Sequence, residues 1–450
     1  MNDVNVNLAL IGCGFHAKRI YVKYLKDRHL PPKLIIDVLS NKEDIMHLIH
    51  QNGWADTRTY FVTPENSYDS FRDDEQREIL DLFVVLGIDK AIISTPPEVH
   101  VPYSELCLKA GIKVLVDKPL SAPRNISSGN SQELLDDLKS LLRYDKGDNI
   151  IVQCQRRRHD GYKYVKELIR EVDRKYGIRP HFIDIYHSDG RWDFPDEIAM
   201  LRNHPYTTGY GKLLHSGYHF IDLLAFLTDE VDYEGFDLFS YRHSINDFKT
   251  QVPDSFYMAT FGINNKQLFT DEGHGEIDSY SLIQLKDRGR VKTTASINLL
   301  HTGFSRRSWG VAKADLYKGN GRLRHERVNI QIGPLMNIQV HSYQSTEVHG
   351  DQQLSREEFG GLEHFDIHIF RNAELIGGEP YKLVTLESLE NTTGPNVGQN
   401  ENARYQLVND FLADKESNSA ISSHIRTNIL LASIAKSMHE NQQVSGNFSL

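Results

Sequence analysis

One segment of the chain, residues 91–121, constrains the fold more than any other because strand and helix signals alternate within it. Its first apolar run stops at Pro96 and Pro97, since prolines lack a backbone donor and fix φ. A stretch with helical spacing of apolar residues follows and stops at Gly111, where a glycine commonly ends a helix. A second apolar run, residues 114–116, comes directly after it. This order of strand, helix and strand predicts a βαβ unit of a parallel sheet.

The second of these strands carries a charged turn, Asp117-Lys118-Pro119, at its carboxyl end. In open α/β sheets, ligands bind at the carboxyl ends of the parallel strands. A lysine between an acid and a proline at that place is interpreted as a positioned cation. The other interpretation is an ordinary βαβ unit that ends in a surface lysine, and this segment alone leaves both open.

The beginning of the chain carries a glycine turn of the type that binds dinucleotides. An apolar strand over residues 4–11 runs directly into the sequence GCGFHA, which has the spacing G-x-G-x-x-A before a predicted helix. Gly12 permits the tight turn and Gly14 lets the backbone approach a pyrophosphate, which the free amides at the start of the helix then bind. The pattern predicts NAD or NADP as cofactor, with contacts from Gly12, Gly14, Phe15 and His16.

The group that contacts the adenosine ribose is expected near the end of the second strand, residues 34–39. Asp37 lies at about the twenty-residue offset from the glycine turn that such an acid requires. If Asp37 faces the ribose, NAD is favoured; if Ser40 and Lys42 face it, the 2′-phosphate of NADP would be tolerated. The sequence leaves this choice open, and Ser40 is a predicted cofactor contact.

The composition limits the class of protein. The chain has 450 residues, of which 39% are hydrophobic and 25% charged, and this balance fits a globular protein with two domains. Its formal net charge of −10 disfavours nucleic acid and anionic membranes as partners. Its three cysteines are too few and too scattered for a disulfide framework or a zinc site, so we expect a reducing compartment and no metal. Since the sequence has neither a signal peptide nor an apolar run of membrane length, we expect a cytoplasmic protein.

The segment 91–121 resembles the Gfo/Idh/MocA family of NAD(P)-dependent oxidoreductases. Members carry a strand ending in Thr-Pro, a helix, and a strand ending in Glu-Lys-Pro; this chain has Asp117 in place of the glutamate. A later strand ends in QRRRHD, similar to the family's Asn-Arg-Arg-Phe, with Arg157 at the matching arginine. Consecutive arginines fit either a solvated turn or an anionic substrate group, so Arg157 is a candidate substrate contact. The resemblance also implies cofactor contacts from Thr95, Pro96, His100, Asp117 and Lys118.

A second group of titratable residues lies in the sequence GYGKLLHSGYHFID, residues 209–222. Helical spacing predicts that His215, His219 and Asp222 share one face. The family has an aspartate, a histidine and a second aspartate in this pattern; His219 and Asp222 match, whereas His215 replaces the first aspartate. The resemblance implies that His219 is the general base and that His215 and Asp222 contact the substrate. Helix histidines bonded to neighbours, or a metal-binding pair, would also fit the spacing.

The family oxidises or reduces a secondary alcohol, usually on a sugar, a cyclitol or a sugar nucleotide. We therefore expect hydride transfer between nicotinamide and such a carbon. His219 would take the hydroxyl proton, Lys118 would stabilise negative charge on the oxygen, and His215 is a further catalytic candidate. Two alternatives stay open: a cofactor-binding regulator without turnover, and an enzyme that keeps NAD tightly bound through a net non-redox reaction.

The expected architecture has two α/β domains. Residues 1–149 are predicted to form a Rossmann domain with a doubly wound parallel sheet, and residues 150–450 a substrate domain with a large, mainly antiparallel sheet. The resemblance implies that the open face of this sheet makes subunit contacts, in a homodimer or homotetramer. Expected strands cover 256–262, 279–286, 292–300, 327–332 and 336–342, expected helices 360–376, 405–412 and 422–440, and irregular segments a surface insertion at 64–73 and an aromatic stretch at 191–210.

Overall fold

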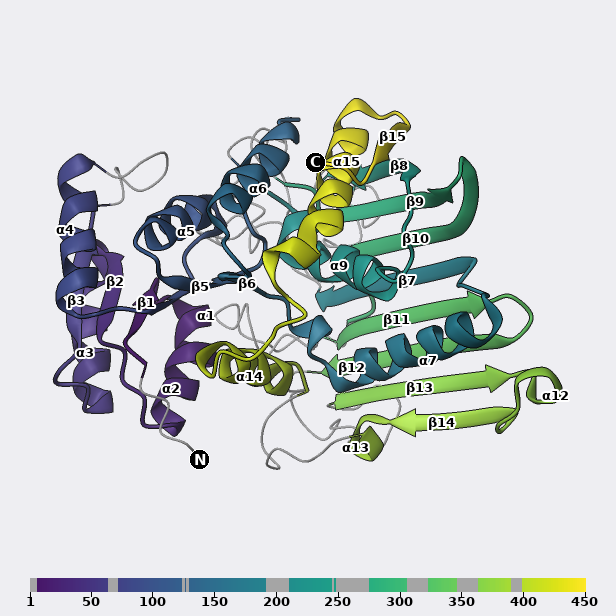
Figure 1. Ribbon diagram of the computed structural model, residues 1–450, viewed down its shortest axis with the longest axis horizontal. Helices are drawn as coiled ribbons and strands as arrows, with labels where there is room; N and C mark the ends of the chain where they lie inside the picture. Colours follow the sequence, from purple (N-terminus) through teal and green to yellow (C-terminus); the bar gives the residue numbers. More distant parts are fainter. Residues whose placement is uncertain are drawn as a thin grey trace, which may run out of the picture.

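The computed structural model contains two β-sheets that lie side by side, with the C-terminal helices between them (Figure 1). It describes residues 6–63, 72–123, 126, 129–191, 210–244, 247, 275–305, 323–345, 363–389 and 399–450. Two predicted features, the strand at 256–262 and most of the insertion at 64–73, lie outside the described residues. The same holds for nearly all of the predicted aromatic stretch at 191–210.

The first sheet consists of six parallel strands in the order β3-β2-β1-β4-β5-β6. Its strands are β1 (Leu8–Ile11), β2 (Leu34–Val38), β3 (Arg58–Val62), β4 (Lys90–Ile93), β5 (Lys113–Asp117) and β6 (Ile150–Gln153). The first helix after β1 begins as α1 (Phe15–Ala17) and continues through a π-helical segment (Lys18–Val22) into α2 (Lys23–Asp27). The other helices of this part are α3 (Lys42–Asn52), α4 (Asp73–Val85), α5 (His100–Lys109) and α6 (Gln132–Tyr144).

Helices cover both faces of this sheet. Along β1, Ala9 and Ile11 pack with α4, α5 and α6, whereas Leu8 and Leu10 pack with α2 and α3. The two-residue period of a strand produces this division, and a strand buried on both faces must be apolar throughout. The predicted doubly wound parallel sheet is therefore confirmed, and its carboxyl-terminal edge carries both the glycine turn and Lys118.

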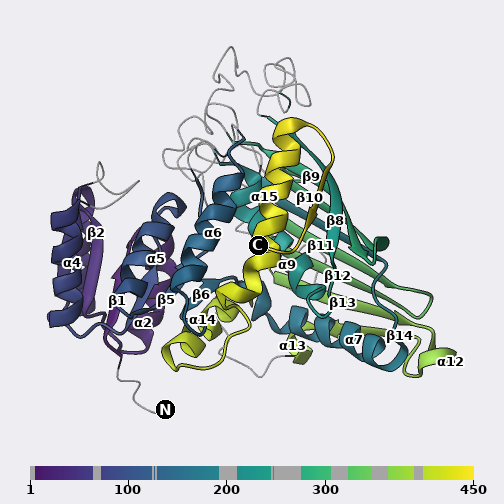
Figure 2. The same ribbon diagram turned by 45° about the horizontal axis from the view of Figure 1, so that its top comes forward.

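In the part of the chain that the structure describes, the second sheet has nine strands in the order β14-β13-β12-β11-β7-β10-β9-β8-β15. Its strands are β7 (Phe182–Arg191), β8 (Gly235–His243), β9 (Asp278–Asp287), β10 (Arg290–Thr302), β11 (Leu323–Ile332), β12 (Met336–Ser345), β13 (Glu363–Arg371), β14 (Tyr381–Thr385) and β15 (Val444–Asn447). Neighbouring strands run antiparallel except β7 and β10. Three helices, α7 (Asp160–Tyr176), α9 (Tyr218–Leu227) and α15 (Ile425–Glu440), lie on one face of the sheet (Figure 2). The predicted mainly antiparallel sheet is confirmed.

One predicted helix, residues 360–376, is wrong. Strand β13 occupies most of this range and only the short α12 (Ala373–Ile376) is helical. Phe365, Ile367 and Ile369 alternate into the core, a two-residue period that fits a strand paired on both sides. The predicted strands at 279–286, 292–300, 327–332 and 336–342 are confirmed by β9, β10, β11 and β12.

The C-terminal part of the chain returns to the first sheet. Helix α14 (Gln399–Leu412) packs on the same face as α2 and α3, and Lys90 on β4 donates to the Leu412 carbonyl at 2.7 Å. Ile151 of β6 forms an isolated bridge with Ala420. The domain boundary at residues 149 and 150 stays a prediction, and β6, just beyond it, pairs with β5 in the first sheet. None of the helices in the described ranges is long and apolar enough to cross a bilayer.

An apolar patch lies on the face of the second sheet opposite the helices. Phe239 on β8 and Leu282 on β9 are paired neighbours, 41% and 51% exposed, while the adjacent Leu238 and Ile283 are buried on the helix side. Tyr241 extends the patch and stacks on Tyr280 at a centroid distance of 4.8 Å. A patch of this kind on an uncovered sheet face fits a subunit interface.

We predict that this face mediates assembly, so lysine at both Phe239 and Leu282 should shift the protein towards monomer in sedimentation, because two charges would have to be buried in the interface. The matched control is Val84→Lys, since Val84 is 80% exposed on α4 of the first sheet. A wild-type protein that sediments as a monomer at micromolar concentration would contradict the prediction.

Candidate functional site

The glycine turn lies between β1 and α1 and packs against the end of β4. Gly12 has a φ of +81°, and its Cβ, if present, would lie 2.7 Å from the Ser94 carbonyl oxygen. A side chain at Gly12 is therefore opposed by both backbone strain and contact. Gly14 has a φ of −70°, and nothing lies within 4 Å of where its Cβ would be. This open space allows a pyrophosphate to approach the backbone, so the turn fits a dinucleotide.

Asp37 reaches the glycine turn from β2. Its Oδ2 accepts the Cys13 N–H at 2.7 Å, and its Oδ1 accepts Asn41 Nδ2 at 2.9 Å. Ser40, the other predicted ribose contact, is exposed on the 3-10 turn η2 (Leu39–Asn41). Of the two alternatives that the sequence leaves open, the structure brings the carboxylate to the turn.

Asp117 connects the carboxyl ends of β4 and β5 to the helix after the glycine turn. Its carboxylate accepts the Tyr21 hydroxyl at 2.5 Å and the Ser94 hydroxyl at 2.5 Å. His16 Nε2 lies 3.8 Å from Asp117 Oδ2, and Phe15 is 64% exposed at the start of α1. The structure thus brings these predicted cofactor residues together, with Asp117 bonded to protein hydroxyls.

His100 joins two of the predicted cofactor loops. Its Nδ1 lies 2.8 Å from the Pro119 carbonyl oxygen and its Nε2 lies 3.0 Å from the Thr95 carbonyl oxygen. The ring is 1% exposed, because it fills the space between the turn at Thr95-Pro96 and the turn at Lys118-Pro119. The ring therefore connects the two loops at the edge of the sheet, and its contact with the cofactor stays a prediction.

Lys118, His215 and His219 meet where the two sheets adjoin. The Lys118 ammonium donates to the backbone oxygen of His215, which belongs to a π-helical segment (Leu213–Gly217) directly before α9. His219 lies in the first turn of α9 and is 6% exposed. The π-helical turn changes the simple α-helical spacing that the sequence suggests for the two histidines, and it is the backbone of His215 that binds Lys118.

The protonation of this group suits acid–base chemistry. Burial, and then the Arg404 guanidinium, lower the pKa of Lys118 from 10.5 to about 8. Burial, and then the Lys118 cation, lower the pKa of His219 well below its ordinary value. At neutral pH, His219 is therefore an uncharged proton acceptor beside a cation that can stabilise negative charge.

Arg404 is a member of the site that the sequence prediction missed. It acts on Lys118 and His219 through its charge and comes from α14, a helix that the sequence pattern placed only from residue 405 onward. No motif in the sequence marks this arginine, which lies between the buried Ala403 and the half-buried Tyr405. Only the return of the C-terminal segment to the first sheet places it beside Lys118.

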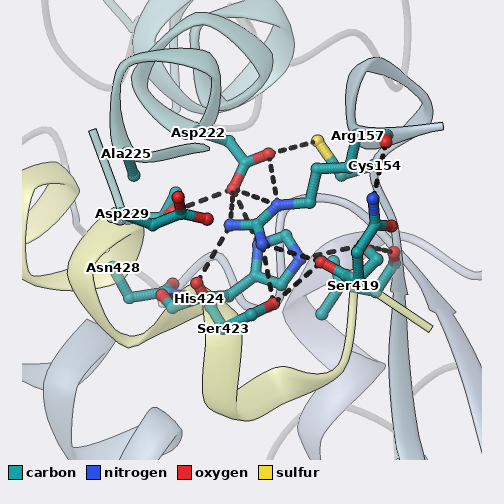
Figure 3. Close-up of polar contacts among 12 residues, drawn as sticks. Cys154, Arg157, Asp222, Ala225, Asp229, Ser419, Ser423, His424 and Asn428 are labelled. Atoms are coloured by element: carbon teal, nitrogen blue, oxygen red, sulfur yellow. Dashed lines mark hydrogen bonds and ion pairs between the residues drawn. The ribbon is translucent and has the colours of Figure 1, made fainter. Parts of the chain in front are cut away.

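Arg157 and Asp222, both predicted to contact substrate, bind each other in the interior (Figure 3). Arg157 Nε lies 2.9 Å from Asp222 Oδ2 and Arg157 Nη2 lies 2.7 Å from Asp222 Oδ1. The remaining Arg157 donors bind the Asn418 carbonyl at 2.9 Å and the Ser423 carbonyl at 2.9 Å. The two side chains are 2% and 0% exposed, so the pair is enclosed in the fold, and a substrate contact of either residue stays a prediction.

The C-terminal segment completes this network. His424 Nδ1 lies 3.0 Å from Asp222 Oδ1, and the Thr427 hydroxyl donates to the same oxygen at 2.8 Å. Burial by itself would raise the pKa of Asp222, but Arg157 and then His424 overcome it and hold the pKa well below the ordinary value. The carboxylate is therefore ionised and fully bonded within the fold.

Removing Arg157 should destabilise the protein more than removing a surface arginine. We expect Arg157→Met to lower the free energy of unfolding by about 3–5 kcal/mol, because the buried Asp222 charge loses its partner. The control is Arg158→Met: Arg158 binds Asp410 at 2.7 Å but is 29% exposed, so its loss should cost less than about 1 kcal/mol. Urea denaturation measures both, and equal losses would contradict the buried-pair interpretation.

The two glycines of the turn should respond differently to substitution. Gly12→Ala should lower the free energy of unfolding by about 1–2 kcal/mol through left-handed strain alone, and by more through contact with Ser94. Gly14→Val should leave the melting temperature nearly unchanged and abolish NAD binding in calorimetric titration, because its side chain would occupy the space for the pyrophosphate. Unchanged NAD affinity in Gly14→Val would overturn the assignment of this turn.

Comparison with known proteins agrees with this fold and with the NAD-binding glycine turn. Residues 6–141 match the family model described as an oxidoreductase family with an NAD-binding Rossmann fold, GFO_IDH_MocA. A search of curated protein sequences gives no match. Among solved structures, levoglucosan dehydrogenase, in complex with NADH and L-sorbose, superposes with a TM-score of 0.62 at 14% identity over 98% of each chain.

Two further structures share the fold over nearly their whole length. An aldose-aldose oxidoreductase from Caulobacter crescentus, complexed with glycerol, has a TM-score of 0.57 at 13% identity and covers 98% of this chain and 99% of its own. An oxidoreductase from Agrobacterium radiobacter, in complex with NAD+, L-tartaric acid and magnesium, has a TM-score of 0.57 at 13% identity over 98% of each chain. At these identities the likeness establishes the fold, while the family match rests on the first domain. Residues 6–141 of this chain therefore match the Gfo/Idh/MocA model of oxidoreductases with an NAD-binding Rossmann fold.

Proposed function

We propose that this oxidoreductase transfers hydride between NAD and a secondary alcohol or ketone of a sugar or cyclitol. The observation that carries the proposal is the meeting of Lys118, from the edge of the NAD-binding sheet, with the backbone of His215 beside His219. A base and a cation at the junction of two sheets can act on one oxygen of a substrate bound between them. When bound, the nicotinamide supplies the acceptor or donor for hydride.

His219 is the proposed general base in the direction of alcohol oxidation. Its lowered pKa keeps the imidazole uncharged at neutral pH, so it can take the hydroxyl proton. Lys118 is proposed to donate a hydrogen bond to the same oxygen and stabilise its negative charge. His215 contributes its backbone oxygen to orient Lys118, and its side chain is a proposed substrate contact.

We propose NAD, not NADP, as the preferred cofactor. Asp37 places a carboxylate at the glycine turn, bonded to the Cys13 N–H. A carboxylate near this turn accepts hydrogen bonds from a ribose diol and repels a 2′-phosphate. Gly12 and Gly14 would hold the pyrophosphate, together with amides at the start of α1.

The substrate class is proposed from the fold and from what similar proteins bind. L-sorbose in the complex of levoglucosan dehydrogenase and the name aldose-aldose oxidoreductase both refer to carbohydrates. The latter name also favours a second candidate, in which one NAD stays bound and is recycled between two sugars. Absorbance of bound reduced nicotinamide in the purified protein, before cofactor is added, separates the two candidates.

The decisive test measures turnover of a sugar and cyclitol panel with NAD and with NADP. His219→Ala should lower kcat by about a hundredfold to ten-thousandfold while NAD affinity is retained, because only the proton acceptor is lost. Lys118→Ala should lower kcat as well, and the double variant should fall by much less than the product of the two effects, since both groups act on one oxygen. Full kcat in His219→Ala across the pH range would contradict the mechanism.

The pH profile and His215 provide the controls for this test. Because Lys118 is needed as a cation and its pKa is about 8, wild-type kcat/KM should fall as the pH rises above that value, and Lys118→Ala should lose this dependence. His215→Ala should raise KM more than it lowers kcat if its side chain only contacts substrate. The opposite pattern would identify His215 as the base.

A further inference from the structure

We propose that Cys154 is a positioning residue that fixes which nitrogen of His219 carries the proton. This inference deepens the proposed function and rests on His219 as the base. Cys154 follows β6 and is fully buried. Its Sγ lies 3.5 Å from His219 Nδ1 and 3.0 Å from Asp222 Oδ2, so the thiol lies between the base and the buried carboxylate.

The direction of these hydrogen bonds follows from the partners. Asp222 is ionised beside Arg157 and can only accept, so the thiol proton must point to Asp222 Oδ2. Burial, and then the Asp222 charge, raise the pKa of Cys154 well above its ordinary value, so this proton is retained. The sulfur then has a lone pair directed towards His219 Nδ1. This lone pair can accept a hydrogen bond only if Nδ1 carries the ring proton.

A proton on Nδ1 leaves Nε2 of His219 with its lone pair free, which is the state that a base acting through Nε2 requires. The relay therefore runs from Nδ1–H to Sγ, and from Sγ–H to Asp222. Asp222 is itself held by Arg157, by His424 at 3.0 Å and by Thr427 at 2.8 Å. Because the carboxylate is anchored on so many sides, it can hold the thiol in one orientation.

The thiol also separates His219 from a negative charge. A carboxylate bonded directly to Nδ1 would raise the pKa of His219 by stabilising imidazolium. Here the thiol stands between them and Arg157 neutralises the carboxylate, so burial and nearby cations determine the pKa. The charged and titratable groups that act on His219 come from five places. They are Lys118 after β5, Cys154 after β6, Arg156 from the 3-10 turn that follows, Asp222 on its own helix and Arg404 from α14.

The experiment compares Cys154→Ala, Cys154→Ser and the control Cys107→Ala in the full chain. Cys107 is also fully buried but lies on α5, a helix that packs on the first sheet. Cys154→Ala should lower kcat with little change in the KM of the sugar, and by less than the loss of the base itself, which is about a hundredfold to ten-thousandfold. Cys154→Ser should recover most of this loss, since a hydroxyl can accept and donate in the same directions. Cys107→Ala should keep the wild-type kcat.

A second measurement reports the tautomer without turnover. The protein is labelled with 15N-histidine, and the His219 signals are assigned by their loss in His219→Gln. In the substrate-free wild type and in Cys154→Ser, His219 should be protonated at Nδ1, whereas Cys154→Ala should show a mixture of both tautomers or mainly the Nε2–H form. The proposal is overturned if Cys154→Ala keeps the Nδ1–H tautomer, or if wild-type His219 carries its proton on Nε2.

The two measurements separate this proposal from the proposed function. If His219→Ala retains full kcat, the assignment of the base fails, while the tautomer shift in Cys154→Ala still supports the relay. If His219→Ala is inactive but Cys154→Ala matches the wild type in kcat, pH profile and tautomer, the relay fails and the base stands. A loss of kcat in Cys154→Ala that Cys154→Ser does not recover, with the tautomer unchanged, assigns Cys154 a packing role and overturns the proposal.

Discussion

The buried carboxylate of Asp222 is the constraint on which the rest of the site depends. A carboxylate with no solvent exposure is costly unless it is paired and hydrogen-bonded on several sides. Its partners come from three places: Arg157 from the segment after β6, Cys154 from the end of that strand, and His424 with Thr427 from the C-terminal segment. These segments must all come together before the charge can be buried, so the network joins both sheets and fixes the rotation of α9. His219 is one turn away on that helix, and its position follows from this arrangement.

The pKa values in the site depend on the pairing of the Asp222 carboxylate with Arg157. Asp222 is paired with Arg157, so its charge raises the pKa of the neighbouring His219 only weakly. Burial, and then the nearby cations, lower the pKa of His219 and keep it uncharged. Burial, and then the charge of Arg404, also lower the pKa of Lys118, to about 8. An uncharged imidazole and an ammonium that gives up its proton more easily than an ordinary lysine thereby lie together, a combination that suits the proposed acid–base role near neutral pH.

The parts of the fold that could be predicted from sequence are those set by local patterns. The glycine turn, the proline-terminated β4 and the helix ending at Gly111 each depend on residues close together in the chain, and the structure has them. The prediction of a helix at 360–376 failed because the alternation of Phe365, Ile367 and Ile369 is too short to distinguish a strand from a helix. The strand is stabilised by pairing with β12 on one side and β14 on the other. The partners of Arg157 could not be predicted from local patterns, since one of them, Asn418, is 261 residues away in the chain. The resemblance to a family motif suggests a substrate contact, whereas the structure shows a buried ion pair.

The two departures from the family pattern, Asp117 and His215, can be understood within the same balance. Asp117 is shorter than glutamate, and its carboxylate binds the hydroxyls of Tyr21 and Ser94, so the contact stays inside the first domain. An aspartate at position 215 would add a negative charge close to Lys118 and raise the pKa of that ammonium. With histidine there, Lys118 donates to a backbone oxygen, which orients it without adding a charge. Burial and Arg404 then determine its pKa, so this exchange leaves the lysine in place and makes it a stronger acid towards the oxygen that it would contact.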